Sequence, residues 1–426
     1  MRLETNYYGT LLKKKKKSGP TSLMDRLTHL SFRSVLWCYI IILKLAKQFR
    51  LQRPFPQSGP VEILLTGTFF SDNWIISLLQ PLALTQRCGR IRMVSSSPVP
   101  AIEKVEAVYP SKLLTKLIGR SPARLATFLW IGFRTRPHIV GGFHLLINGL
   151  IAILLARLIG VKALYSCCGG QIECEGGGYK ADNHLFSNLC GPDQAIESHL
   201  LNAVSEADLV ITRGNLAIRF FREHGVETQF YVIPGGMDGT KFTPSTLPAE
   251  YDLITVSNLI PRKRVDLFLH IINVVRTVRP NIRAVILGDG PLRGELENLA
   301  RDLNLTESVH FAGHQKQVTD WLRKGKIFVL TSESEGLSQA MIQAMLSGLP
   351  VVATQVGEAE ELVKNGINGF LLSNWTAASF AEPIIQLLDD VKKHAAFSKA
   401  ARISAETCDV HYLAHRWDEI LNELVS

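Results

Sequence analysis

Short runs of β-branched and other apolar residues alternate with helical stretches along most of the chain, and this alternation strongly constrains the fold. A first series of runs ends in a passage rich in Pro and Gly at 232–248, and a second series begins after it. Strands that alternate with helices favour parallel sheets with helices on both faces. The sequence therefore predicts an α/β fold with two doubly wound, Rossmann-like sheets. The expected strands are 61–66, 91–95, 138–142, 162–166, 208–212 and 230–233, and then 252–257, 283–288, 308–313, 327–332, 350–354 and 369–372.

This alternation divides the 426 residues into four expected parts. They are a basic extension at 1–60, a first Rossmann-like domain at 61–245, a second at 246–405 and an amphipathic C-terminal helix within 406–426, which could cover either domain. Ligands of such sheets bind beyond the carboxyl ends of the strands. We therefore expect the functional site in a cleft between the two domains.

The first 60 residues form a basic arm on a body that is close to neutral. They hold twelve Lys or Arg and two acidic residues, against 47 Lys or Arg and 38 Asp or Glu in the whole chain, and include five consecutive lysines at 13–17. Taken alone, such a lysine run is typical of a solvated tail. Because the excess charge lies at one end, an anionic membrane surface is favoured over nucleic acid as the partner.

A helix expected over 27–47 gives this arm an amphipathic segment. Its uncharged stretch at 34–43 is shorter than the roughly 20 residues of a membrane span. We therefore expect a helix that lies on the bilayer surface; the alternative is an extra helix packed on the first domain. At about 100° per residue, three charges face away from four apolar side chains: Arg26, Arg33 and Lys44 against Leu30, Cys38, Tyr39 and Ile42.

A second basic segment at 111–136 has six Lys or Arg and no acid. Together, residues 1–50 and 111–136 predict peripheral binding to an anionic membrane. The basic residues of the second segment are Lys112, Lys116, Arg120, Arg124, Arg134 and Arg136, interleaved with Leu113, Leu114, Phe128, Leu129 and Trp130.

The seven cysteines are an odd number without the pattern of a secreted disulfide framework, which favours the reducing cytoplasm. Four of them lie near one histidine in the sequence, where a zinc site is an alternative. No Cys-x2-Cys pair fixes a tetrahedral site there, and adjacent cysteines rarely bind one ion together, so no metal is expected. The residues concerned are Cys167, Cys168, Cys174, His184 and Cys190.

The segment 331–354 carries the first chemical signal. It runs from a strand through Glu335 and Gly336 into a helix that begins near Ser338. A helix N-terminus offers free N–H groups and a positive dipole, which suit a phosphate. Gln343 lies further along the helix on roughly the same side. The alternative is a strand–helix corner that serves packing alone.

Basic residues at the exit of the first strand of the same sheet carry the second signal. Asn258, Arg262, Lys263 and Arg264 follow this strand and precede a helix. A lysine there can neutralise a diphosphate as a point charge, although a solvated helix start would look the same. Because both segments leave one sheet at the same edge, we predict that they form a diphosphate site.

Five stretches in this order, which include parts of the two segments above, complete a pattern. They are VIPGGMDGTKFTP, SNLIPRKRVD, LGDGPLRGELENLARDLNL, VHFAGH and EGLSQAMIQAMLSGLPVVAT, followed by GINGFLL. The chain resembles the retaining, nucleotide-sugar-dependent glycosyltransferases of family four, which have the GT-B fold. The resemblance covers most of 61–426 and is strongest over 232–372.

The resemblance implies roles for individual residues. Lys263 would bind the donor diphosphate and Glu335 the transferred sugar, while His144 would lie beside the reacting sugar. The final helix would cross back to the N-terminal domain. The other donor-side residues are Gly336, Leu337 and Ser338 for sugar and phosphates, Phe311, Gly313 and His314 for the base, and Gly67 for the phosphates.

Two positions depart from the family pattern. Asn258 stands where the family most often has arginine, and Gln343 replaces the second glutamate of its Glu-(seven residues)-Glu motif. Arg262 or Arg264 could replace the arginine, and Gln343 can still hydrogen-bond a ribose hydroxyl. These departures leave an inactive nucleotide-sugar-binding partner of another transferase as an alternative. A sugar-nucleotide epimerase on the same fold is a further one.

The expected reaction needs no metal and no cofactor besides the nucleotide sugar, and proceeds with retention. The acceptor would be a saccharide or a lipid-linked sugar, in polysaccharide or glycolipid assembly on the cytoplasmic membrane surface. A Gly-rich loop at 165–179 supplies the acceptor-side candidates Glu173, Glu175 and Tyr179. The alternative for this stretch is a flexible surface loop.

Overall fold

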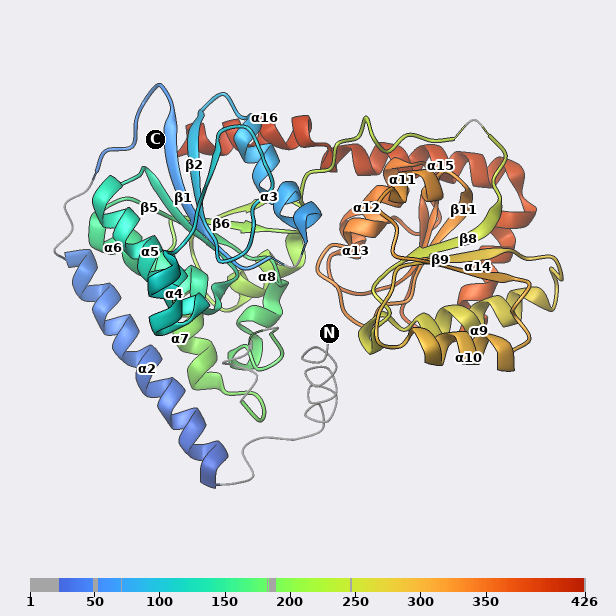
Figure 1. Ribbon diagram of the computed structural model, residues 1–426, viewed down its shortest axis with the longest axis horizontal. Helices are drawn as coiled ribbons and strands as arrows, with labels where there is room; N and C mark the ends of the chain where they lie inside the picture. The colour runs from blue at the N-terminus through green and yellow to red at the C-terminus, as the bar shows by residue number, and fades with distance from the viewer. Residues whose placement is uncertain are drawn as a thin grey trace. The chain divides into compact units, whose positions relative to one another are not determined.

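The computed structural model describes residues 23–48, 53–69, 71–181, 183, 189–245 and 247–424. The chain divides into two compact units, Met1–Gly236 with Leu413–Ser426, and Met237–Tyr412. Each unit holds one parallel sheet covered by helices (Figure 1). The predicted α/β fold with two doubly wound sheets is therefore confirmed. The lysine run at 13–17 lies outside the described residues.

The first sheet has the strand order β3-β2-β1-β4-β5-β6-β7. All but one of its strands match a predicted run. The short strand β3 was missed because its sequence VEAV lies half-exposed at the sheet edge, where a glutamate interrupts the apolar run. The strands are β1 Val61–Thr66, β2 Cys88–Val94, β3 Val105–Val108, β4 Ile139–Phe143, β5 Lys162–Ser166, β6 Leu209–Thr212 and β7 Gln229–Val232.

The register of this sheet brings three strand exits together. Thr66 of β1 pairs with Gly142 of β4, and Phe143 of β4 pairs with Ser166 of β5. Residues that follow β1, β4 and β5 therefore lie at one edge of the sheet. This edge includes Gly67 and His144.

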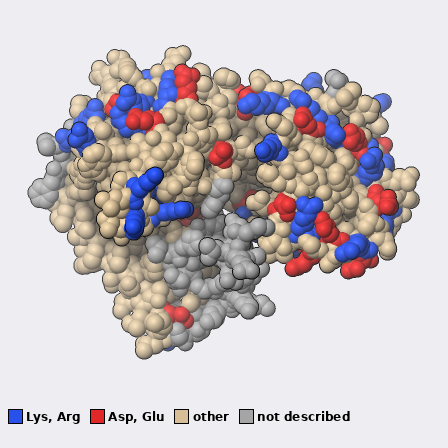
Figure 2. Space-filling view, in the orientation of Figure 1, with Lys and Arg blue, Asp and Glu red and all other residues tan. Residues whose placement is uncertain are grey.

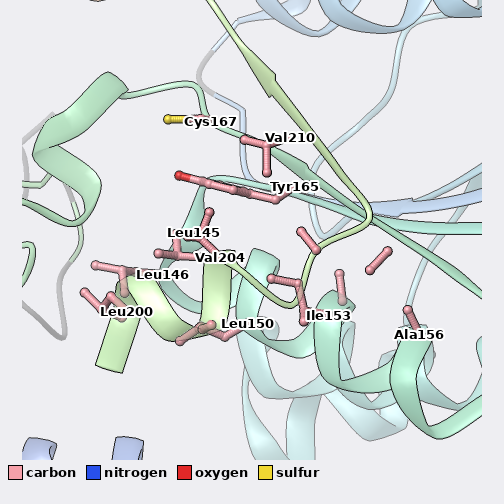
Figure 3. Packing of buried hydrophobic residues seen from close by; sticks show 14 of the residues in the cluster. Leu145, Leu146, Leu150, Ile153, Ala156, Tyr165, Cys167, Leu200, Val204 and Val210 are labelled. Atoms are coloured by element: carbon pink, nitrogen blue, oxygen red, sulfur yellow. The ribbon is translucent and has the colours of Figure 1, made fainter. Parts of the chain in front are cut away.

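Helices cover both faces of the first sheet and bury two apolar clusters. Figure 3 shows part of one of them, with Tyr165 of β5 between Val210 of β6 and Leu145. At the end of α6, Gly160 adopts φ 74°, which lets the chain turn directly into β5. The helices are α2 Leu23–Gln48, α3 Asp72–Leu84, α4 Lys112–Ile118, α5 Arg120–Thr135, α6 Leu150–Ile159, α7 Gln194–Val204, α8 Asn215–Glu223 and α16 Val410–Glu423.

The helix α2 packs on α6 and α7 and buries Leu36, Ile40 and Leu43 in the core. The helix therefore packs on the first domain, as the alternative expected, while contact of its exposed side with a bilayer stays a prediction. Of the side chains expected on the apolar face, Leu30, Cys38 and Ile42 are exposed rather than packed. By length and composition alone, α2 is also the one helix of the described part that could cross a membrane.

A buried carboxylate holds α2 in place. Asp193 caps the N-terminus of α7 by accepting from the backbone N–H groups of Ala195 and Ile196. Its Oδ2 also lies 2.6 Å from Nδ1 of the buried His29, and Arg33 Nε donates to both of its oxygens at 3.0 and 3.1 Å. The Asp193 side chain therefore links α7 to α2, although Arg33 and Asp193 are 160 residues apart in sequence.

The second sheet has the order β10-β9-β8-β11-β12-β13, and every pair is parallel. Helices on both faces bury two further clusters. The strands are β8 Tyr251–Val256, β9 Ala284–Leu287, β10 Val309–Gly313, β11 Gly325–Leu330, β12 Val351–Thr354 and β13 Gly369–Leu372. The helices are α9 Val265–Arg276, α10 Arg293–Asp302, α11 Val318–Leu322, α12 Gln339–Leu346, α13 Ala359–Leu362, α14 Ala377–Asp389 and α15 Val391–Ala405.

The last helix, α16, begins in the second unit and ends in the first. Leu413, Trp417, Ile420 and Leu421 belong to the apolar cluster that covers β1 and α3. The first unit is therefore discontinuous in sequence, because its core includes residues from both ends of the chain.

Candidate functional site

In the second unit, the loop after β8 is hydrogen-bonded to the loop after β11. Glu333 N donates to Arg262 O at 2.8 Å, Thr331 Oγ1 donates to Lys263 O at 3.0 Å, and Arg262 Nη1 donates to Ser334 O at 3.0 Å. The two segments that the sequence places at one sheet edge are therefore in direct contact.

An ion pair joins the two side chains expected to bind the donor. Lys263 Nζ lies 2.5 Å from Glu335 Oε1, and the two side chains are 16% and 11% exposed. Their charges are mostly shielded from water, which strengthens their interaction. A cation and a hydrogen-bond acceptor are thus held side by side at the start of α12.

The arginines that flank Lys263 have different partners. Arg264 binds Asp266 at 3.1 Å and lies 3.5 Å from Glu333, and the hydrogen bonds with Asp266 raise its pKa above the ordinary value. Arg262 instead donates to a neutral carbonyl. Since two carboxylates neutralise Arg264, Arg262 is the better placed of the two for binding an anion.

The N-terminus of α12 supplies backbone donors beside this pair. Ser338 is the N-cap, and its Oγ accepts from Met341 N at 3.4 Å. Within the described part of the chain, the N–H groups of Gly336, Leu337 and Ser338 have no hydrogen-bond partner. Such free donors at a helix start can bind phosphate or sugar oxygens.

Gly357, which follows β12, supports the turn at Glu335 and was missed in the sequence. Its φ is +55°, and an added Cβ would lie 2.1 Å from Glu335 O. The next residue, Glu358, donates its N–H to Gly336 O at 3.0 Å. The available signal was a glycine three residues after a predicted strand, at the carboxyl edge of the sheet.

The remaining donor-side residues take different positions. Gln343 is buried in α12, with Nε2 3.9 Å from Met237 Sδ, so its amide faces the protein. Asn258 is exposed directly after β8. At the end of β10, Phe311 is half-buried, Gly313 is buried and His314 is exposed.

In the first unit, His144 directly follows β4 and adopts φ 63°, a left-handed value that is uncommon for residues other than Gly. Its Nδ1 lies 2.9 Å from Glu173 Oε1, and its ring meets Trp74 edge-on at 5.4 Å. The side chain is 28% exposed. The imidazole is therefore held on two sides and open on another.

Glu173 occupies a different place from the one expected of an acceptor-side residue. It is buried, and its carboxylate also accepts from Leu145 N, Tyr165 Oη and Gly169 N. The assignment of Glu173 to acceptor contact is therefore wrong, because the protein uses all of its hydrogen-bonding capacity. Glu175 and Tyr179 are half-buried in the same loop, and their acceptor role stays a prediction.

Burial and charge act in opposite directions on this pair. Burial alone would lower the pKa of His144, but the charge and hydrogen bond of Glu173, with a smaller effect of Cys168, raise it to about 9. Burial would raise the pKa of Glu173, yet His144 and the backbone donors hold it below its ordinary value. Each group of the pair therefore favours the charged form of the other.

Other residues near this edge serve packing. Gly67 is buried, and an added Cβ would meet Phe143 at 3.0 Å, so the loop after β1 rests directly on β4. Arg124 of α5 is buried and donates to Thr66 Oγ1 and Asn148 Oδ1, and burial lowers its pKa to about 10. The prediction that Arg124 and Phe128 face a membrane is wrong, since both lie in the interior.

The zinc alternative finds no support in the described residues, which contain no group of three or more His, Cys, Asp or Glu that could hold a metal. His184 lies outside them. Cys190 instead donates to Asp25 at 3.0 Å.

A sequence profile described as "Glycosyl transferases group 1" matches residues 241–404. These residues are a group 1 glycosyl transferase domain. The group 1 domain thus contains the Lys263–Glu335 pair, the N-terminus of α12 and Gly357. The resemblance to group 1 glycosyl transferases that was inferred from the sequence is confirmed for these residues, and the assignment to retaining enzymes of family four stays a prediction.

Two curated relatives are similar to part of this chain. The Vi polysaccharide biosynthesis protein VipC/TviE of Salmonella typhi is 35% identical over 114 residues, which is 25% of this chain and 20% of that protein. The UDP-Gal:alpha-D-GlcNAc-diphosphoundecaprenol alpha-1,3-galactosyltransferase of Escherichia coli is 28% identical over 174 residues, 37% of this chain and 45% of that enzyme. The chain thus spans less than half the length of each relative.

Among solved structures, HepE of Anabaena in complex with UDP superposes with a TM-score of 0.66 at 19% identity, over 85% of this chain and 100% of that one. This likeness extends beyond the group 1 domain to the first unit. The chain therefore has the two-domain GT-B architecture that the sequence predicted.

Proposed function

We propose that this protein is a retaining glycosyltransferase that moves a sugar from a nucleoside diphosphate sugar to an acceptor hydroxyl. The observation that carries the proposal is the contact of Lys263 with Glu335 beside the free N–H groups of residues 336–338, within a group 1 domain. This arrangement offers positive charge to a diphosphate and an acceptor to sugar hydroxyls.

The proposed mechanism follows from where charge develops. Breaking the sugar–phosphate bond leaves oxocarbenium character on the sugar and negative charge on the diphosphate. Lys263, Arg262 and the N-terminus of α12 stabilise the departing diphosphate. Glu335 orients the sugar hydroxyls, and the acceptor hydroxyl attacks from the face that the diphosphate leaves. No metal ion takes part in this scheme.

UDP is the first nucleotide to test, because HepE was crystallised with UDP and the Escherichia coli relative is named for UDP-Gal. A ligand at 100 times its dissociation constant stabilises the native state by about 2.7 kcal/mol. We expect UDP, among UDP, GDP and ADP, to raise the midpoint of thermal unfolding, and Lys263→Ala to abolish the shift.

Lys241→Ala is the matched control, since Lys241 pairs with Asp238 on the surface of the same unit. It should keep the shift. If no nucleotide stabilises the protein, or if the Lys263 and control variants respond alike, the proposed donor site is wrong.

A nucleotide-sugar-binding partner without transferase activity is the second candidate. It rests on the exposed Asn258, which replaces an arginine, and on Gln343, whose amide faces Met237. Slow hydrolysis of the nucleotide sugar without acceptor separates the two candidates. Binding with neither hydrolysis nor transfer would favour the second.

We also propose that the first unit binds the cytoplasmic face of an anionic membrane and takes a lipid-linked or saccharide acceptor for polysaccharide or glycolipid assembly. The names of the two curated relatives, a polysaccharide biosynthesis protein and an enzyme acting on a diphosphoundecaprenol, support this class of acceptor. The seven free cysteines are in keeping with a reducing compartment.

The helices α2, α6, α5 and α4 pack one on the next and support the membrane proposal. Figure 2 shows blue side chains without a red neighbour on the surface where Figure 1 places α4, and Lys112, Lys116 and Arg120 are exposed there. Clustered exposed apolar side chains mark interaction surfaces. The exposed apolar side chains of these four helices include Leu27, Leu30, Trp37, Leu158, Trp130, Phe133, Leu113 and Leu117.

Point variants test this surface better than removal of α2, which would open the core around Leu36 and Leu43. We expect Trp37→Ser with Trp130→Ser to reduce flotation with vesicles that contain phosphatidylglycerol. Val391→Ser, at an even more exposed apolar position in the second unit, should leave flotation unchanged. Equal flotation of both variants would contradict the proposed surface.

A further inference from the structure

The carboxylate of Glu173 is fixed by four donors. Oε1 accepts from His144 Nδ1 at 2.9 Å and from Gly169 N at 2.5 Å, while Oε2 accepts from Leu145 N at 2.6 Å and Tyr165 Oη at 2.8 Å. Two of these donors are backbone groups on either side of the site. Hydrogen bonds to an ionised carboxylate are strong and short. Glu173 is therefore held as an anion in a set orientation.

The imidazole of His144 is positioned from several directions. Its backbone N–H donates to Ser166 O at 3.0 Å, and its carbonyl accepts from Gly149 N at 2.8 Å. Trp74 meets the ring edge-on. With Nδ1 directed at Glu173, the ring has one other nitrogen, Nε2, which has no hydrogen-bond partner within the described residues.

We propose that Glu173 is a positioning residue that keeps His144 as an imidazolium, so that Nε2–H is a fixed, charged hydrogen-bond donor at the edge of the first sheet. This inference rests on the proposed function, in which His144 contacts the transferred sugar. It adds the protonation state of His144 and the residue that sets it. An imidazolium donates from both nitrogens and accepts from neither, so its substrate partner is an oxygen that accepts.

The groups around His144 favour the charged form on balance. Glu173 is the dominant favourable partner, and Cys168 contributes in the same direction. Arg213, which donates to Cys168 Sγ at 3.3 Å, opposes it. Tyr165 acts indirectly, because its hydroxyl holds Glu173 while its ring lies in the core (Figure 3).

The test is an NMR titration of the histidine side chains in the full-length protein. His144→Gln identifies the His144 signal among the twelve histidines. In the wild type, we expect the ring to stay protonated through pH 8. In Glu173→Gln, the pKa of His144 should fall from about 9 to below 6.5, because burial and Arg213 are then opposed by Cys168 alone.

Tyr165→Phe is the control for disturbance of the site. It removes one hydrogen bond to Glu173 and keeps the carboxylate, so His144 should remain charged at neutral pH. If the wild-type His144 titrates at or below 6.5, or if Glu173→Gln leaves its titration unchanged, the proposal is overturned. The wild-type titration decides even if Glu173→Gln does not fold.

Enzyme kinetics give an independent readout. The alkaline limb of the kcat profile should move to lower pH in Glu173→Gln, and the Tyr165→Phe profile should follow the wild type. The titration needs no catalysis. Failure to detect transfer would therefore count against the proposed function, while an unshifted His144 would count against the role of Glu173.

Discussion

Lys263 and Glu335 bind each other, with Nζ 2.5 Å from Oε1. In the proposed function, the first binds the diphosphate and the second binds the transferred sugar. A phosphate oxygen that approaches Lys263 therefore competes with a carboxylate already bound to it. On the proposed function, we therefore expect donor binding to be coupled to a rearrangement of this pair.

Glu335→Gln should separate the two roles. Removing the negative partner leaves Lys263 free for phosphate, so we expect UDP to bind more tightly, by up to about tenfold. Transfer should nevertheless fall roughly 100-fold, because the sugar loses a charged partner. Calorimetry with UDP and initial rates measure the two effects. Glu333→Gln, which alters the neighbouring pair with Arg264, is the control, and weaker UDP binding in Glu335→Gln would contradict the competition.

Gly357→Ala should damage the donor site, and Gly366→Ala should not. Both glycines have positive φ, at +55° and +75°, so each substitution should cost about 1 kcal/mol of stability through backbone strain. Only at Gly357 would the new Cβ also strike the carbonyl of Glu335, since nothing lies within 4 Å at Gly366. We expect UDP affinity to fall at least ~10-fold in the first variant alone. Equal affinities in calorimetry would exclude support of the turn by Gly357.

The ion pair of His144 and Glu173 should stabilise the fold in a defined pH window. Because the pKa of His144 is raised in the folded state, its protonation stabilises the fold fully at pH values below 6.5, the pKa of histidine in the unfolded chain. This contribution is lost as the pH rises towards about 9. The lowered pKa of Glu173 stabilises above its ordinary value of 4.5 and is lost as pH falls below it. The stability difference between wild type and Glu173→Gln should therefore be largest between pH 5 and 6.5 and shrink towards pH 9. Urea unfolding at several pH values measures it, and a difference independent of pH would contradict the charged pair.

Asp193→Ala should loosen α2 from the first unit. The variant loses a helix cap, typically about 1 kcal/mol, and leaves the buried His29 and the half-exposed Arg33 without their shared carboxylate. We expect a total loss of about 2–4 kcal/mol in unfolding free energy. Lys47→Ala, which removes the surface pair of the same helix with Glu206, should cost less than about 1 kcal/mol. Similar losses in the two variants would show that Asp193 does not anchor α2.

Much of the framework could be predicted because local patterns record it. Eleven of the twelve expected strands begin and end within two residues of those observed, and 162–166 is among the exact matches, since buried parallel strands appear as continuous apolar runs. The contact between the loops after β8 and β11 at Lys263 could also be predicted from the sequence, because parallel strands bring their carboxyl ends to one edge of the sheet. The edge strand β3 lacked such a run.

Contacts that depend on distant partners could not be predicted in this way. The helix α2 is apolar on more than one side, so its periodicity did not reveal which side meets α6 and α7. Glu173 stands in a Gly-rich stretch that is typical of a surface loop, and only the fold places it under His144. Arg124 likewise looked like one more cation of a basic segment until α5 turned it towards Thr66.

The discontinuity of the first unit affects how the protein matures during synthesis. Leu413, Trp417, Ile420 and Leu421 complete the apolar cluster over β1 and α3, yet they leave the ribosome after the whole second unit. Until then, the nascent first unit exposes the apolar surface that α16 will cover. The second unit is continuous in sequence and can fold in the meantime. Packing of the final helix therefore completes the first unit. Premature termination shortly before residue 413 would leave a product with exposed apolar surface, which chaperones and proteases bind.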